Sequence, residues 1–233
     1  MNEISELQEI IDNSDNIVFF GGAGVSTESG IPDFRSEKGV FKSLEKYGHS
    51  PEYLVSHTYY MNHPEEFFNY YKENLIFKDA MPNPAHLKLA ELEKAGKLKA
   101  VITQNIDGLH QKAGSKNVLE LHGSIHRNYC QRCGRFYAAD YVKESKSIPR
   151  CSCGGIIKPN IVLYGEALND ELLCDAREYI AYADLLIVVG TSLTVYPAAR
   201  LIRNFKGTIT TFNNYVYIFC SYSCDIRISF RII

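Results

Sequence analysis

The sequence has 233 residues, which suits one large domain or one domain that carries a small insert. Its composition, 45% hydrophobic and 22% charged, is that of an ordinary globular protein. A net charge of -2 and no dense run of lysine and arginine exclude a broad electrostatic attraction to nucleic acid, and no apolar run reaches the roughly 18 residues of a membrane span. Residues 1–15 are acidic and polar, unlike a secretory signal, so we expect a cytoplasmic protein, acting as a monomer.

The first half of the chain alternates helix and strand signals. Apolar residues recur at helical spacing over residues 4–11, and the continuous apolar run 17–20 predicts a strand buried on both faces of a parallel sheet. Residues 41–78 are rich in Tyr, Phe and His and predict a helical insert. Beyond it, a helix is predicted over 85–94 and a second buried strand over 100–102.

The second half continues this alternation as far as residue 207. A strand is predicted over 161–163, a helix from a cap at Asn169 or Asp170 to about residue 181, and the plainest buried strand over 185–189. Alternating strands and helices predict an α/β fold with a doubly wound, Rossmann-like parallel sheet, which binds ligands beyond the carboxyl ends of its strands. The tail, residues 208–233, has neither Gly nor Pro and only three charged residues, so the positions of its turns cannot be predicted.

A glycine-rich segment, Gly22-Ala23-Gly24-Val25-Ser26, directly follows the first strand. Glycines let backbone N–H groups approach a pyrophosphate, and a helix that starts there favours an anion. The alternative is a plain strand-to-helix turn, since the full G-x-G-x-x-G pattern is absent. Residues 29–36 continue as a loop with an aspartate, an aromatic residue and an arginine, which can close over a ligand.

Three further segments place polar or small residues at strand ends. Residues 103–110, Thr-Gln-Asn-Ile-Asp-Gly-Leu-His, offer amides and a carboxylate suited to ribose hydroxyls and a carboxamide, although such a run also suits a simple turn. Gly190-Thr191-Ser192 is a second small-residue turn. In Leu121-His122-Gly123-Ser124 the histidine is either a general base or a structural residue, and His110 and His126 are alternative bases.

Four of the seven cysteines lie within 24 residues and predict a metal site. Two close pairs of soft thiolates suit tetrahedral zinc, and disulfides or free thiols are the alternatives. Because four cysteines leave no open coordination position, the predicted zinc is structural. The predicted ligands are Cys130, Cys133, Cys151 and Cys153.

Residues 158–166 form an extended stretch that ends in Gly-Glu. Such a stretch either offers an edge to which a substrate peptide adds as a strand, or is an internal strand of the core.

These six elements, in this order, closely resemble the sirtuin family of NAD-dependent protein-lysine deacylases of the bacterial type. The similarity covers about residues 4 to 207, and its most specific blocks are G-A-G-x-S, G-I-P-D-F-R-S, T-Q-N-I-D-G-L-H and L-H-G. The resemblance implies that the protein transfers acetyl groups from lysine to ADP-ribose and releases nicotinamide and O-acetyl-ADP-ribose. NAD would be consumed as a co-substrate, and acetylated proteins or peptides would be the partners.

The resemblance also implies roles for particular residues. His122 would be the catalytic base, and Asn105 and Asp107 would hold the nicotinamide ready to leave. The remaining cofactor-binding positions would be Gly22, Ala23, Gly24, Ser26, Thr27, Phe34, Arg35, Gln104, Ile106, Gly190, Thr191 and Ser192. The substrate peptide would meet Val162, Tyr164, Gly165 and Glu166, and the four clustered cysteines would hold the zinc.

The implied organisation is a discontinuous NAD-binding domain of residues 1–40, 81–122 and 157–233, a helical insert at 41–80 and a zinc-binding module at 123–156. Desuccinylating sirtuins carry a Tyr-x-x-Arg pair in the insert, whereas residues 68–71 here are uncharged, so we expect neutral acyl groups to be preferred. Sirtuins usually end with a strand that finishes in Asn, a place that only Asn213 or Asn214 would fill here. Mono-ADP-ribosyl transfer and NAD binding without turnover are the alternative functions.

Overall fold

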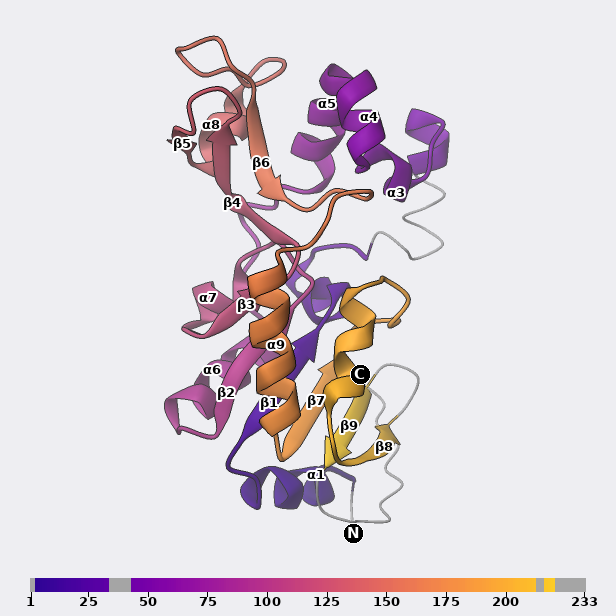
Figure 1. The fold of residues 1–233 in the computed structure, drawn as a ribbon, viewed down its shortest axis with the longest axis vertical. Helices are drawn as coiled ribbons and strands as arrows, with labels where there is room; N and C mark the ends of the chain where they lie inside the picture. The colour runs from indigo at the N-terminus through magenta and orange to yellow at the C-terminus, as the bar shows by residue number, and fades with distance from the viewer. Residues whose placement is uncertain (1–2, 34–42, 213–215, 221–233) are drawn as a thin grey trace.

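The computed structural model describes residues 3–33, 43–212 and 216–220, which form two lobes (Figure 1). The large lobe is built on a six-stranded sheet and the small lobe on a three-stranded sheet with helices beside it. Among these residues no helix combines the length and apolar character needed to cross a bilayer.

The large sheet confirms the predicted Rossmann-like architecture. Its strand order is β3-β2-β1-β7-β9-β8, and the first four strands run parallel. The three central strands, β2 from Ala100 onward, are built largely of buried apolar residues because helices cover both of their faces. The strands are β1 (Ile17–Gly21), β2 (Leu98–Thr103), β3 (Val118–Glu120), β7 (Leu185–Val189), β8 (Thr208–Phe212) and β9 (Val216–Cys220).

The two strands from the tail pair differently from the rest. β9 runs antiparallel to β7, and β8 runs antiparallel to β9 at the edge of the sheet. The tail therefore forms a hairpin that extends the sheet. Asn213 and Asn214, the candidates for the terminal asparagine of the family, lie outside the described residues.

Helices on both faces make the large lobe doubly wound. One apolar core joins the sheet to α9 and η2, and another joins it to α6 and contacts the apolar face of α1. Asn169 caps α9, one of the two caps expected from the sequence, and Asn83 caps α6. The helices are α1 (Glu3–Asp12), α6 (Pro84–Lys94), α7 (Leu109–Ala113) and α9 (Asp170–Tyr182), with the 3-10 helices η1 (Ala23–Ser29) and η2 (Ala198–Asn204).

The small lobe combines the cysteine-rich segment with the helical insert. Its antiparallel sheet has the order β5-β4-β6, and one apolar core joins this sheet to the insert. Within the insert, Ser50 and Ser56 cap α3 and α4 with their hydroxyls. The elements are β4 (Gly123–Cys130), β5 (Phe136–Tyr137), β6 (Ile157–Ile161), α3 (Pro51–Leu54), α4 (His57–Asn62), α5 (Pro64–Asn74) and α8 (Ala139–Glu144).

The strand expected at residues 161–163 is wrong in position and in sheet. β6 ends at Ile161 and pairs antiparallel with β4, so residues 157–161 lie in the small sheet and not in the parallel one. Ile161 and Leu163 are apolar because they are buried in the core of the small lobe. Beyond β6 the chain turns at Gly165, whose φ of 91° a side chain rarely adopts.

Candidate active site

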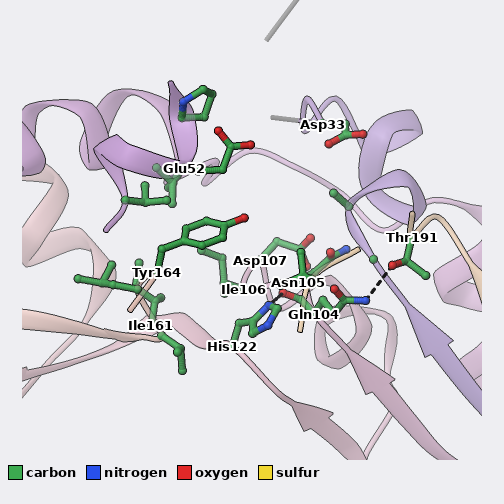
Figure 2. Close-up of a pocket in the computed structure, with 18 of the residues that line it drawn as sticks. Asp33, Glu52, Gln104, Asn105, Ile106, Asp107, His122, Ile161, Tyr164 and Thr191 are labelled. Atoms are coloured by element: carbon green, nitrogen blue, oxygen red, sulfur yellow. Dashed lines mark hydrogen bonds between the residues drawn. The ribbon is translucent and has the colours of Figure 1, made fainter. Parts of the chain in front are cut away.

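A cavity of about 460 Å³ lies at the carboxyl ends of the central parallel strands, between the two lobes (Figure 2). This is where ligands bind in open parallel sheets. Most of the residues predicted to form the site line it. They are Gly22, Ala23, Ser26, Gln104, Asn105, Ile106, Asp107, His122, Val162, Tyr164, Gly165, Glu166, Gly190, Thr191 and Ser192.

Two predicted residues support the cavity without lining it. Gly24 lies against Gly190, and a Cβ at Gly24 would stand 2.7 Å from the Cα of Gly190. The Gly24 N–H donates to the Gly190 carbonyl at 2.9 Å, so the close approach of the two glycine turns fixes both. Thr27 donates its hydroxyl to the Gly24 carbonyl. Phe34 and Arg35, predicted to close over the cofactor, lie outside the described residues.

A hydrogen-bonded triad of side chains forms the floor of the cavity. The Ser26 hydroxyl donates to Asp107 Oδ2 at 2.7 Å and accepts from Asn105 Nδ2 at 3.0 Å. The second carboxylate oxygen of Asp107 accepts the backbone N–H of Leu109 at 2.9 Å. With both oxygens engaged, the carboxylate is held in one orientation toward the cavity.

The position of His122 determines which of its nitrogens is basic. Its Nδ1 lies 2.9 Å from the carbonyl oxygen of Gln104, and a carbonyl only accepts, so Nδ1 carries the proton. The lone pair is then on Nε2, as a general base requires. The Gln104 side chain in turn donates to the Thr191 hydroxyl at 2.9 Å, which links the loops after β2 and β7 (Figure 2).

The two alternative histidines do not line the cavity. His110 is 1% exposed, packs 4.7 Å from the ring of His86, and neither of its ring nitrogens has a hydrogen-bond partner among the described residues. Burial, aided by His86, lowers the pKa of His110 to about 3, so it stays neutral. His126 is exposed, and its Nε2 contacts the backbone of Asp107 at 3.0 Å.

The peptide-side wall comes from the loop after β6. The Tyr164 backbone pairs with the insert, accepting from His57 N at 2.9 Å and donating to the Val55 carbonyl at 3.1 Å. The Glu166 carboxylate bonds to Leu163 N, His57 and Lys158 within the protein. Its side chain therefore shapes the loop on which the resemblance implies that Glu166 meets the substrate peptide.

No sequence motif predicted the part of the wall that comes from the insert. Apolar and aromatic side chains predominate there, and only their high frequency over residues 41–78 was a signal. These residues are Pro51, Glu52, Val55, Tyr70, Leu75 and Phe77. Another residue without a motif is Asn83, whose amide donates to the Val25 carbonyl at 2.7 Å and so anchors the glycine-rich loop from behind.

The four clustered cysteines fit a zinc ion. Their sulfurs all lie within 4.8 Å of one another, and three of the separations are 3.5–3.6 Å. Tetrahedral Zn–S bonds place sulfurs about 3.8 Å apart. The Cys153 N–H and the Tyr137 hydroxyl lower the pKa of Cys151 to about 5. The pKa of Cys153 rises to about 11 because adjacent sulfurs outweigh the opposing Gly155 N–H, a repulsion that a dication would remove.

A parallel sheet with two glycine turns, a polar cavity at its strand ends and a four-cysteine lobe define a dinucleotide-binding α/β protein with a metal-binding lobe. Residues 22–197 match the family model described as the Sir2 family. The chain belongs to this family.

Known proteins similar to this chain carry consistent names. Proteins of Clostridium acetobutylicum and Clostridium perfringens, each named an NAD-dependent protein deacetylase, are 59% identical over 89% and 88% of this chain and 85% of their own length. A structure of Sir2 with a p53 peptide and NAD+ has a TM-score of 0.75 and 43% identity, covering 86% of this chain and 82% of that one. A Sir2 variant with deacetylated p53 peptide and 3'-O-acetyl-ADP-ribose has a TM-score of 0.80 and 42% identity, covering 91% and 87%.

Proposed function

We propose that this protein is an NAD-dependent protein-lysine deacetylase that moves the acetyl group from lysine to ADP-ribose. The observation that carries the proposal is the convergence, in one cavity, of the Ser26–Asp107–Asn105 triad with a histidine whose lone pair is on Nε2. The names of the Clostridium relatives and the ligands of the solved Sir2 structures support it.

In this proposal the sheet lobe binds NAD. The backbone of Gly22 and Ala23 faces the pyrophosphate, and the turn 190–192 lies on the other side of the crevice. The carboxamide of the nicotinamide meets Asn105 and Asp107, whose geometry is set before binding by the bonds to Ser26 and Leu109 N. When bound, NAD supplies a glycosidic bond whose cleavage releases nicotinamide and leaves an electrophilic ribose carbon.

His122 acts in this proposal as the general base. Its Nδ1 proton is committed to the Gln104 carbonyl, so Nε2 can take a proton from a ribose hydroxyl. Because the Gln104 side chain also bonds to Thr191, the base and the two cofactor loops are held in one geometry. Proton transfer then needs no rearrangement of the histidine.

The substrate peptide meets the loop that follows β6. Tyr164 lies over the cavity in Figure 2, and Val162, Gly165 and Glu166 line the same wall. Because the Glu166 carboxylate is engaged within the protein, this loop offers backbone groups and the Tyr164 ring to the peptide. The four cysteines would hold one zinc whose role is to stabilise this lobe.

The test is to incubate the purified protein with NAD and an acetyl-lysine peptide, and to quantify nicotinamide, O-acetyl-ADP-ribose and deacetylated peptide by mass spectrometry. Equal yields of the three products, dependent on both substrates, are expected. ADP-ribose attached to protein without loss of acetyl groups would instead identify a mono-ADP-ribosyltransferase. NAD binding without any product would identify a regulatory NAD-binding protein.

A further inference from the structure

The loop that carries Asn105 and Asp107 is held by four donors from residues 121–126, at the start of β4 (Gly123–Cys130). Four carbonyls of residues 103–107 accept hydrogen bonds of 2.9–3.0 Å from residues 121–126. Two donors are backbone N–H groups and two are histidine ring nitrogens. The pairs are Leu121 N with Thr103 O, His122 Nδ1 with Gln104 O, Ile125 N with Ile106 O, and His126 Nε2 with Asp107 O.

The last of these pairs is not explained by the proposed catalytic roles. His126 is exposed and does not line the cavity. A carbonyl accepts only, which requires the proton of a neutral His126 to be on Nε2. His122, four residues earlier, carries its proton on Nδ1. The two histidines thus serve the same loop in opposite tautomers, one keeping a basic nitrogen and the other using its Nε2–H as a clamp.

Close packing fixes the ring of His126 over the turn after Asp107. A Cβ placed on Gly108 would stand 2.7 Å from both Cδ2 and Nε2 of His126, so only a glycine lets the ring approach the backbone. Gly108 also has a φ of 72°, which favours glycine for a second reason. The His126 ring therefore packs against the peptide group between Asp107 and Gly108, next to the residue that carries the Asp107 carboxylate.

We propose that His126 is a positioning residue for Asp107, an inference that rests on the proposed NAD chemistry. Its Nε2–H fixes the Asp107 carbonyl, and thereby the backbone from which the carboxylate reaches Ser26 and the nicotinamide side of the cavity. Without this donor the Asp107 carbonyl turns toward water and the loop gains freedom that NAD binding must remove again. His126 should affect the binding of NAD and not that of the peptide. The loop after β6, which would meet the peptide, is held by other contacts.

The experiment compares His126→Phe, which keeps a flat ring and removes the donor, with His126→Gln, which keeps an N–H of similar reach. NAD affinity is measured by calorimetry, which needs no turnover, and KM values are measured for NAD and for an acetyl-lysine peptide. We expect His126→Phe to weaken NAD binding and raise KM for NAD about tenfold, with KM for the peptide and Tm unchanged. His126→Gln should stay within about twofold of the wild type.

Three results would overturn the inference: equal NAD affinity in all three proteins, equal losses in both variants, or parallel rises in the two KM values. Failure of the proposed function is distinguishable from these, because a wild-type protein that binds NAD without deacetylating the peptide still allows the comparison of NAD affinities.

Discussion

The two walls of the cavity are built in different ways. The sheet wall consists of loops at strand ends, held by short hydrogen bonds such as Ser26–Asp107 at 2.7 Å and by the contact of two glycine turns. The small-lobe wall consists mainly of apolar and aromatic side chains from the insert and the loop after β6, together with Glu52 and Glu166. In Figure 2, Glu52, Tyr164 and Ile161 lie on one side of His122, and Thr191 and Gln104 lie on the other.

Long side chains hold the small-lobe wall together. Lys72 is 8% exposed and donates to the carbonyls of Ser145 and Ser147 at 2.9 Å, which ties the insert to the cysteine-rich segment. In the opposite direction, the Lys143 ammonium donates to the Lys72 carbonyl and so ties the cysteine-rich segment to the insert. Lys158 and His57 both bond to Glu166. These contacts join the insert, the cysteine-rich segment and the loop after β6.

The two ways of holding the walls indicate different roles for the sheet wall and the small-lobe wall. Groups that must meet a reacting atom within a fraction of an ångström are on the wall fixed by backbone and short side chains. In the proposed function, the groups that would select the acyl chain and the peptide are on the wall fixed by packing and long side chains. Changes in the sheet wall should therefore affect the chemical step, whereas changes in the small lobe should affect stability and selectivity.

The largest effect is expected from His122→Ala, which removes a group of the sheet wall. Deacetylation should fall by about a hundred- to ten-thousand-fold, the usual contribution of a general base. Tm should be unchanged, because the side chain belongs to none of the three apolar cores of the described residues. Turnover numbers and a thermal melt check both statements, with His63→Ala on the exposed surface as the control. Undiminished turnover would assign the base to another residue.

Removal of zinc tests the small lobe. Metal analysis of reduced protein should find one zinc per chain, and Cys151→Ser should abolish it. Because Cys130 and Cys151 belong to the core shared with the insert, Tm should fall by roughly 10 °C. KM for the peptide should rise more than the Kd for NAD. Cys174→Ser, outside the cluster, should keep the zinc and the Tm. Zinc-free protein with an unchanged Tm would contradict the assignment.

The sheet wall could be predicted from sequence because its signals are local. β1, β7 and residues 100–102 of β2 are apolar runs, and each strand is followed at once by residues of the site. β3 was not predicted because three residues, one of them the charged Glu120, give no periodicity. Asn83 caps α6, and its bond to Val25 joins residues 58 apart, which no local pattern reveals.

The small-lobe wall could not be predicted in the same way. Ile161 and Leu163 look the same whether they are buried in a parallel sheet or in the core of the small lobe, so β6 was placed in the wrong sheet. Tyr70 and Phe77 face the cavity only because the insert folds against the cysteine-rich segment. The pairing of β9 with β7 likewise depends on tertiary context that the turn-free composition of the tail does not encode.

Acyl selectivity is the third test, and it concerns the charge of the cavity. The carboxylates that line it are Asp33, Glu52, Asp107 and Glu166, and no lysine or arginine lines it in the part of the chain that the structure describes. A succinyl group brings a further negative charge, so its kcat/KM should be at least about tenfold below that of acetyl. Glu52→Gln should reduce the difference in kcat/KM between the acetyl and succinyl peptides. Equal efficiency on the two peptides would contradict the expectation.

The smallest effect concerns Glu166, and it links stability to pH. Burial alone would raise the pKa of this carboxyl, but the Leu163 N–H, His57 and Lys158 outweigh burial and hold the pKa below its usual 4.5. A carboxyl whose pKa is lower in the folded state stabilises the protein above the unfolded-state pKa, and this contribution is lost as the pH falls through the folded-state pKa.

Glu166→Gln should therefore lower the free energy of unfolding by about 1 kcal/mol at pH 7, a modest value because the pair with Lys158 is partly exposed. Urea unfolding at pH 7, 5, 4 and 3 should show that the difference in unfolding free energy between the wild type and Glu166→Gln decreases below pH 4.5. Glu178→Gln, on the exposed face of α9, is the matched control and should show no such change. A difference in unfolding free energy that is the same at every pH would mean that Glu166 acts through its shape and not its charge. In that case the loop after β6 would be held mainly by the backbone bonds of Tyr164 to the insert, and its stability would be independent of acid.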